Sequence, residues 1–259
     1  MTIDVLADGS RRPGGGAFYS ALQAARLGQR TLVITRGVPA EIEAMMRPFA
    51  HELTLRVLPA RSTTTLETVS GGQRLLAWAG PVGVPDALDT NVLHLAPVAH
   101  ETASRWRGRA DFVGLTAQGL VRAWAHEGAM LERRELEPRD VPERCDAVVV
   151  SEQERASAAA VERELETLVA VTRGDRPTIV AAPGARPFEL HVPPHDAVRD
   201  DVGAGDVFAA ALFTALARGE GARAAVTLAH AAAAVRIAGD GAAAIGDAAA
   251  IDAQLGARW

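Results

Sequence analysis

The sequence contains no lysine, and all 27 of its basic residues are arginine. This absence excludes the mechanisms that depend on a lysine side chain: the Walker A phosphate loop, the lysine of protein kinases, and Schiff-base or pyridoxal chemistry. A single cysteine, Cys145, excludes an internal disulfide and a cysteine-rich zinc module. Because Cys145 comes just before the apolar stretch 147–150, we expect it in the core.

The sequence also lacks a strong net charge and a long hydrophobic stretch. Its net charge of −5 argues against general binding to nucleic acid. The most apolar late segment, 202–217, contains Asp206 and is too short to span a bilayer, so no membrane partner is predicted. Asp4 and Asp8 interrupt the first apolar stretch, so we predict no signal peptide and expect a cytoplasmic protein. His191 and His195 flank two prolines, a spacing unlike that of helical metal ligands.

Short apolar segments alternate with longer helical patterns, which is typical of an α/β layer fold. Strands are predicted at 31–35, 92–95, 111–114, 147–150 and 178–181, and helices at 17–27, 41–47, 152–168, 205–217 and 222–237. Residues 53–80 break this alternation, because they are rich in threonine and turn at Ser70–Gly72. We therefore predict one domain, 1–259, with an antiparallel β flap at about 53–80 set apart from the parallel sheet.

The most informative motif is Asp200-Asp201-Val202-Gly203-Ala204-Gly205-Asp206, which leads into an apolar helix. The first N–H groups of a helix have no intrahelical partner, so they form an anion site that the helix dipole favours. Asp206 would lie within the first turn, beside that site. A carboxylate there can accept a proton from a hydroxyl while the N–H groups stabilise a phosphoryl group in transfer. The alternative is an ordinary helix start with an acidic first turn.

A second glycine cluster, Gly14-Gly15-Gly16, precedes an alanine-rich helix that ends in Ala-Arg-Leu-Gly28. Consecutive glycines allow a ligand to approach the backbone closely, although a simple hinge before a helix is the alternative. The cluster is not a dinucleotide fingerprint, because that motif needs a glycine where Tyr19 stands. The corresponding position after Gly205 is Phe208, so a Rossmann dehydrogenase is disfavoured.

Taken together, the two motifs resemble those of the ribokinase-like (PfkB-type) family of carbohydrate and nucleoside kinases. The family has a Gly-Gly motif opening an alanine-rich helix, matched at 13–28, and a late Asp-Thr-x-Gly-Ala-Gly-Asp-x-Phe motif, matched at 200–208. Weaker matches are Ser151–Glu154 for an Asn-x-x-Glu motif, Val171–Gly174 for a Thr-x-Gly nucleotide loop, and the late helix around His230. The resemblance implies a three-layer α/β/α sandwich with a mostly parallel central sheet and a small β-strand lid.

The resemblance also implies roles for individual residues. Asp206 would be the catalytic base, with an anion hole formed by the N–H groups of Gly203, Ala204 and Gly205. ATP would be contacted by Thr172, Gly174, Asp200 and His230, and Mg²⁺ would be held through water by Glu154. The substrate would be bound by Asp4, Gly15, Gly16 and, from a Gln-Gly-x-x-Arg segment, Gln118. A homodimer through the β lid is a further implication.

The chain departs from the family pattern at several positions, including the glycine expected after the Thr-x-Gly motif, which is replaced near Pro177. The usual threonine of the late motif is Asp201, the asparagine of the Asn-x-x-Glu motif is Ser151, and the asparagine of the Gly-Gly helix is Tyr19. Asp201 adds negative charge beside the expected triphosphate.

The function that the resemblance implies is transfer of the γ-phosphate of ATP to a hydroxyl of a sugar, an inositol-like polyol or a nucleoside. The alternative is a catalytically weak or inactive sugar- or nucleotide-binding protein on the same fold.

Overall fold

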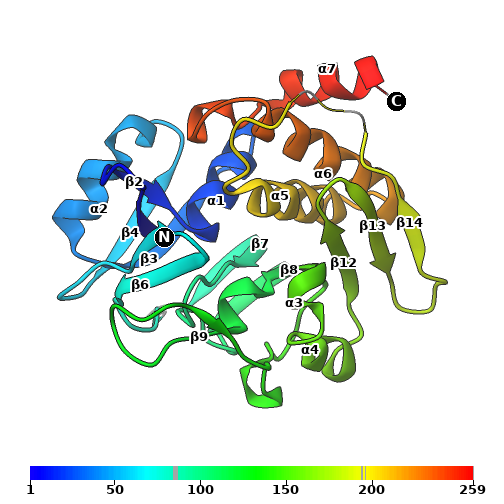
Figure 1. Cartoon of the computed structure of the whole chain (residues 1–259). Coiled ribbons are helices and arrows are strands. Elements are labelled where there is room, and N and C mark those ends of the chain that lie inside the picture. The colour runs from blue at the N-terminus through cyan, green and yellow to red at the C-terminus, as the bar shows by residue number, and fades with distance from the viewer. Residues whose placement is uncertain (84–86, 194, 196, 259) are drawn as a thin grey trace.

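Six strands form the central sheet of the protein, whose computed structural model describes residues 1–83, 87–193, 195 and 197–258 (Figure 1). In the order in which they lie side by side, the strands are β14 (Phe188–Leu190), β13 (Arg176–Ala181), β12 (Leu168–Arg173), β11 (Ala147–Ser151), β8 (Gly108–Thr116) and β7 (Leu88–Leu95). The four strands from β12 to β7 run parallel, β13 runs antiparallel to β12, and β14 runs antiparallel to β13. The predicted, mostly parallel sheet is therefore confirmed.

Helices cover both faces of this sheet. On one face lie α1 (Gly16–Arg26), α5 (Ala204–Ala217), α6 (Ala222–Ile237) and α7 (Ala248–Arg258), and on the other lie the short α3 (Glu152–Arg155) and α4 (Ala159–Glu164) (Figure 1). Strand β11 shows why: Ala147 and Val149 pack in the core with α1, α5 and α6, whereas Val148 and Val150 pack in the core with α4. A strand that is buried on both faces has a continuous run of apolar residues. Successive side chains point to opposite faces of the sheet, so they pack into two different cores.

A smaller, four-stranded sheet lies beside the central one. Its order is β2 (Arg11–Gly14), β1 (Thr2–Val5), β5 (Thr65–Val69) and β6 (Gly72–Ala77), and β5 and β6 form the hairpin predicted to turn at Ser70–Gly72. Strand β1 is fixed on both sides, because it pairs antiparallel with β2 and parallel with β5. The first residues of the chain are thus part of a sheet, as their apolar side chains require.

The predicted flap at 53–80 is wrong at its start. Strand β4 (Thr54–Pro59) belongs to a separate pair with β3 (Leu32–Gly37), and the two strands run parallel. The prediction failed because an alternating pattern indicates a strand but not its direction. The connection from β3 to β4 contains helix α2 (Pro39–Met46), and a connection of this kind joins parallel strands.

The single helix predicted at 152–168 is also wrong, because α3 and α4 are separate and Leu165 is extended. From Leu168 the chain is strand β12, in which Leu168 and Ala170 face one core and Val169 and Val171 the other. Short apolar stretches satisfy helical and strand spacing equally, and packing between β11 and β13 decides this one. The remaining short elements are η1 (Arg47–Phe49), η2 (Ala117–Leu120), β9 (Arg122–Ala123), β10 (Glu132–Arg133), η3 (Pro138–Asp140) and η4 (Ala242–Ala244).

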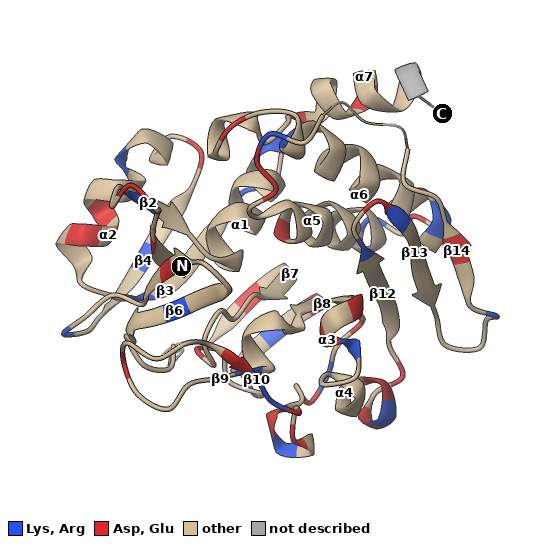
Figure 2. Ribbon diagram, viewed as in Figure 1, with Lys and Arg blue, Asp and Glu red and all other residues tan. Residues whose placement is uncertain are grey.

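Charged residues lie mainly on the outer elements, and α5 and α6 are mostly uncharged (Figure 2). Asp206 is the one charged residue of α5. Within the part of the chain that the structure describes, no helix is long and apolar enough to cross a membrane.

Candidate functional site

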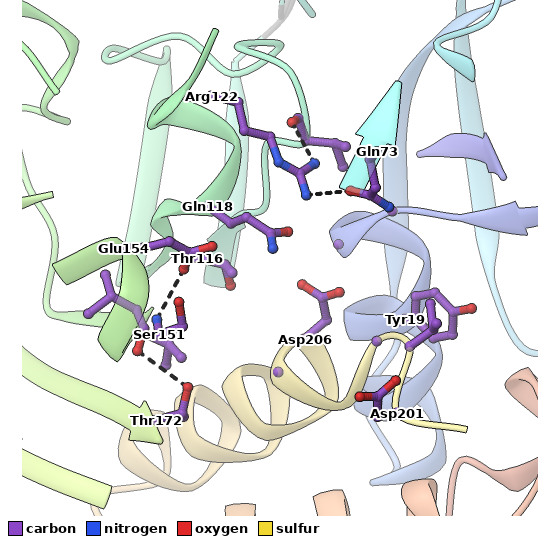
Figure 3. Close-up of a pocket in the computed structure, with 18 of the residues that line it drawn as sticks. Tyr19, Gln73, Thr116, Gln118, Arg122, Ser151, Glu154, Thr172, Asp201 and Asp206 are labelled. Carbon is purple, nitrogen blue, oxygen red and sulfur yellow. Dashed lines mark hydrogen bonds between the residues drawn. The ribbon is translucent and has the colours of Figure 1, made fainter. Parts of the chain in front are cut away.

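A cavity of about 490 Å³ lies between the small sheet, the start of α5 and the carboxyl ends of β8, β11 and β12. Its walls come from segments far apart in the sequence (Figure 3). The lining side chains that carry polar atoms are Asp4, Tyr19, Gln73, Thr116, Gln118, Arg122, Ser151, Gln153, Glu154, Thr172, Asp201 and Asp206. Ligands of open α/β sheets bind outside the carboxyl ends of the strands, and the cavity lies at that edge.

The glycines of the two sequence motifs allow the starts of α1 and α5 to come together. A Cβ atom on Gly16 would lie 2.9 Å from Oδ1 of Asp206, so a larger residue there would collide with the carboxylate. Gly203, the N-cap of α5, has a φ of 80°, and a Cβ on it would overlap the ring of Tyr19. Two motifs separated by almost the whole chain thus meet at one point, as their resemblance to a kinase family implies.

Asp206 lies in the first turn of α5 and points into the cavity (Figure 3). Burial raises the pKa of this carboxyl to about 7; Arg122 opposes the shift, and Glu154 and Asp4 add to it. A carboxyl group that titrates near neutral pH is well matched to accepting a proton. The Asp206 carboxyl therefore lies where it could accept a proton from a ligand bound beside the start of α5.

The N–H groups at the start of α5 are not all free. The Ala204 N–H donates to the Asp201 carbonyl at 3.1 Å, and Ala204 does not line the cavity. Gly203 and Gly205 do line it, and among the described residues neither N–H is paired with a backbone acceptor. The expected anion site is therefore narrower than the sequence predicts, because a turn between Asp201 and Ala204 precedes the helix.

Asp4 lies on β1 and faces the same cavity. The Thr2 hydroxyl donates to its Oδ1 at 2.8 Å, and burial raises the pKa of the Asp4 carboxyl. Gly15, Gly16 and Gln118, the other residues predicted to bind substrate, also line the cavity. The structure thus brings all four of these residues together.

Arg122 and Gln73 line the cavity near Asp4 and were not among the residues singled out from the sequence. Arg122 Nη2 donates to Gln73 Oε1 at 2.8 Å, and its Nη1 donates to the Val98 carbonyl at 3.1 Å (Figure 3). Among the described residues that line the cavity, Arg122 is the one cation, facing four carboxyl groups. Arg122 is the arginine of the Gln-Gly-x-x-Arg segment, so that motif could have identified it from the sequence.

Thr116 is a third residue of the cavity that was not singled out from the sequence. Its hydroxyl shares a hydrogen bond of 2.8 Å with Nε2 of His94, a buried imidazole whose pKa burial lowers to about 3. The imidazole is therefore neutral, and it fixes the orientation of a hydroxyl on the cavity wall.

Glu154, Ser151 and Thr172 line the opposite end of the cavity from Gln73 (Figure 3). Ser151 and Glu154 form a capping box, in which the Ser151 N–H donates to Glu154 Oε2 at 3.0 Å. The Thr172 hydroxyl donates to the Val150 carbonyl at 3.4 Å. The departure from asparagine to Ser151 thus preserves a side chain that caps the helix carrying Glu154.

Three residues predicted to contact ATP do not line the cavity: Gly174, Asp200 and His230. His230 is buried under β13, where its Nε2 shares a hydrogen bond of 2.9 Å with the Thr178 hydroxyl, and burial lowers its pKa to about 4. The Asp200 carboxylate is bonded to Arg236 and to the N–H groups of Val202 and Gly241. Both side chains are engaged within the protein.

The described residues include no cluster of three or more His, Cys, Asp or Glu side chains able to hold a metal ion. Mg²⁺ does not require one, because it keeps several waters and binds one or two carboxylates together with substrate phosphates. Glu154 and Asp206 both line the cavity, so the residues present fit a water-mediated Mg²⁺.

The model of the pfkB family of carbohydrate kinases matches residues 91–248, which is more than half of the chain. The chain belongs to this family. No curated protein sequence matches it. The family resemblance inferred from the glycine motifs is thereby confirmed.

Solved structures place the fold of this pfkB family chain among ribokinases. It is 20% identical to a pyrophosphate-dependent kinase of the ribokinase family complexed with a pyrophosphate analogue and myo-inositol, with a TM-score of 0.76 over 93% of both chains. It is 16% identical to Arabidopsis thaliana ribokinase complexed with ribose and ATP, with a TM-score of 0.73 over 98% of this chain and 96% of the ribokinase. Escherichia coli phosphofructokinase-2, in its tetrameric inhibited form, gives 15% identity and a TM-score of 0.65 over 98% and 95%. The ribokinase-like fold is confirmed.

Proposed function

We propose that the protein is a kinase that transfers the γ-phosphate of ATP to a hydroxyl of a sugar, an inositol-like polyol or a nucleoside. One observation carries the proposal: the Asp206 carboxyl lies half-buried at the start of α5, faces the cavity and has a pKa raised to about 7. Desolvation makes the ionised form of this carboxyl unfavourable for folding, so a role in proton transfer gives a reason for its position.

In this mechanism Asp206 accepts the proton of the substrate hydroxyl as the oxygen attacks the γ-phosphorus. The free N–H groups of Gly203 and Gly205 stabilise the charge on the phosphoryl oxygens during transfer, with the α5 dipole acting in the same direction. The proton leaves the hydroxyl as the new oxygen–phosphorus bond forms and the bond to the ADP leaving group breaks.

The acceptor occupies the end of the cavity near the small sheet. Asp4 accepts hydrogen bonds from its hydroxyl groups, Gln118 offers both a donor and an acceptor, and the backbone at Gly15 and Gly16 approaches it closely. Recognition by buried polar groups makes the site selective, since an acceptor without a matching hydroxyl leaves those groups unpaired.

The donor occupies the end of the cavity formed by Ser151, Glu154 and Thr172. Glu154 holds Mg²⁺ through water, and that ion neutralises phosphate charge when bound. Thr172 contacts the phosphate chain of the donor, whereas Gly174 lies beyond the cavity wall.

Pyrophosphate is the second candidate donor. The specific observation in its favour is that three of the four residues predicted to contact ATP, Gly174, Asp200 and His230, lie outside the cavity lining, whereas Thr172 and Glu154 lie in it. The lining therefore offers contacts for phosphate groups but does not include these three predicted contacts of the nucleotide.

A donor-by-acceptor screen tests the proposal. The protein is incubated with ATP or pyrophosphate, with Mg²⁺, and with each of a set of sugars, inositols and nucleosides, and phosphorylated product is detected by phosphorus NMR. Phosphorylation of at least one acceptor supports the proposal, and the active donor decides between the two candidates. Acceptor binding in calorimetry without product from any pair would favour the alternative, a binding protein on this fold.

The homodimer through the small β-sheet, the single-domain organisation and the cytoplasmic location remain predictions from the sequence. Sedimentation equilibrium of the protein, alone and with a charged residue introduced on β6, tests the first.

A further inference from the structure

The largest fully buried side chain in the described structure is that of an arginine, Arg236, in the last turn of α6. Its Nη2 donates to Oδ2 of Asp200 at 2.8 Å and to the Val202 carbonyl at 2.7 Å. Its Nη1 donates to the Asp200 carbonyl at 3.0 Å and to the Gly239 carbonyl at 3.2 Å. Three of these four hydrogen bonds end on the segment 200–202, which leads directly into Gly203.

Asp200 links this arginine to a second loop. Its Oδ1 accepts from the Val202 N–H at 3.0 Å, and its Oδ2 accepts from the Gly241 N–H at 3.0 Å. Arg12 of β2 approaches the same Oδ2 at 3.5 Å. Burial acts to raise the pKa of Asp200, but the bonds from Arg236, Val202 and Gly241 outweigh it and hold the pKa below its ordinary value. The two residues form an ion pair that joins the backbone of 200–202, just before α5, to the backbone of Gly239 and Gly241 in the loop after α6.

Stability alone does not account for this pair. Burying two charges costs desolvation energy, and well-packed apolar side chains serve stability as well or better. The pair instead fixes the position of the backbone, because a planar guanidinium sets the direction of each acceptor that it binds. The Tyr19 ring completes the arrangement: it lies against Gly203, and the Arg236 guanidinium is 5.7 Å from the ring centroid.

We propose that Arg236 is the positioning residue of the anion site, holding the backbone of 200–202 so that the N–H groups of Gly203 and Gly205 face the cavity. This inference rests on the proposed function, because that function gives the anion site its role, whereas the hydrogen bonds of Arg236 are observed in the structure. Asp200 acts in it as the partner of Arg236 and not as a contact of the donor.

The test compares Arg236→Met with Arg26→Met, a matched control. Arg26 also binds a carboxylate, that of Glu52, and also donates to main-chain carbonyls, those of Ala242 and Ile245, but it lies outside the cavity lining. Two quantities are measured in each purified variant: the Kd of pyrophosphate by calorimetry, and the hydrogen exchange of the amides of residues 200–206.

We expect Arg236→Met to weaken pyrophosphate binding about tenfold or more and to speed amide exchange at 200–206. Arg26→Met should leave both near their wild-type values at temperatures where it is folded. If the single variant does not fold, the double variant Asp200→Asn, Arg236→Met removes the unpaired buried carboxylate and should give the same loss. With donor and acceptor present, kcat should fall by a larger factor than the acceptor KM rises.

Pyrophosphate affinity and amide exchange like those of the wild type, in either Arg236 variant, would overturn the inference. Failure of the wild-type protein to bind pyrophosphate would overturn it as well, because there would be no anion site to position. If the wild type binds pyrophosphate but phosphorylates nothing, and Arg236→Met loses the binding, the proposed function fails and the inference stands.

Discussion

Two half-buried carboxyl groups, those of Asp4 and Asp206, share the cavity, and their surroundings suit them to different tasks. Asp206 is more strongly perturbed, since burial raises its pKa to about 7, where a carboxyl exchanges protons readily at neutral pH. Asp4 receives a hydrogen bond from Thr2 and lies near Arg12 and Arg122, which counteract the effect of its burial. The residue that titrates near neutrality fits proton transfer, and its neighbour fits hydroxyl recognition.

Replacing Asp4 should impair acceptor binding selectively. We expect Asp4→Ala to raise the KM of the acceptor tenfold or more, corresponding to about 1–3 kcal/mol, because the hydroxyl groups it binds would be left unpaired. The KM of the donor should stay near its wild-type value, as measured by steady-state kinetics with each substrate varied in turn. Asp8→Ala, in an exposed turn outside the cavity, is the control. An unchanged acceptor KM in Asp4→Ala would remove Asp4 from the binding site.

The raised pKa of Asp206 also predicts how stability depends on pH. Because the folded-state pKa, about 7, exceeds the ordinary value of 3.8, the folded protein holds this proton more tightly than the unfolded chain does. The contribution of Asp206 to the free energy of unfolding should therefore be greatest below pH 4 and decline as the pH rises to about 7. Asn cannot ionise, so Asp206→Asn should gain stability relative to the wild type over that range, by an amount on the order of 4 kcal/mol at most.

Urea unfolding of the wild type and Asp206→Asn at several values between pH 4.5 and 8 measures this difference. Asp8→Asn is the control: hydrogen bonds from Ser10 lower the pKa of Asp8, so its contribution to stability changes mainly below pH 4 and the difference from the wild type should stay nearly constant over this range. A stability difference between Asp206→Asn and the wild type that does not grow with pH would contradict the raised pKa.

At the scale of elements, the start of α5 determines which N–H groups face the cavity. The segment 200–203 turns so that the Ala204 N–H bonds back to Asp201, and Gly203 then caps the helix with a φ of 80°. The sequence motif was sufficient to predict the helix, its boundary and the glycine turn, because each follows from local chemistry. It was not sufficient to predict the contacts of Asp200, since its carboxylate is bonded to Arg236 and Gly241, which are distant from it in the sequence.

The glycines at the two ends of α5 offer a matched comparison. Gly203 and Gly219 have φ values of 80° and 86°, but a Cβ would overlap Tyr19 only at Gly203, and Gly219 has open space around it. We expect Gly219→Ala to lose about 1–2 kcal/mol of stability, the cost of a left-handed residue, with kcat unchanged. Gly203→Ala should lose more stability and lower kcat at least tenfold, because the anion site must shift. Chemical denaturation and steady-state kinetics of both variants check this, and equal effects at the two positions would contradict it.

At the scale of the molecule, the cavity exists because the small sheet lies over the edge of the central one. Asp4 and Gln73 come from the small sheet, and Thr116 and Asp206 from the central sheet and its helix layer. The sequence predicted the layers, the β5–β6 hairpin and the meeting of two glycine motifs, because periodicity and glycine content report them. Gln73 and His94 could not be found in that way, since a single polar residue within a strand carries no pattern until the fold places it in or beside a cavity.

The central claim is that Asp206 is the base of a phosphoryl transfer, and one kinetic measurement tests it most directly. The turnover of Asp206→Asn is compared with that of the wild type, using whichever donor and acceptor the wild-type protein uses, and the Kd of the donor is measured by calorimetry in parallel. The account predicts that kcat falls by about 10²–10⁴ or more while the Kd of the donor changes little. A variant that turns over at a rate near that of the wild type would contradict it.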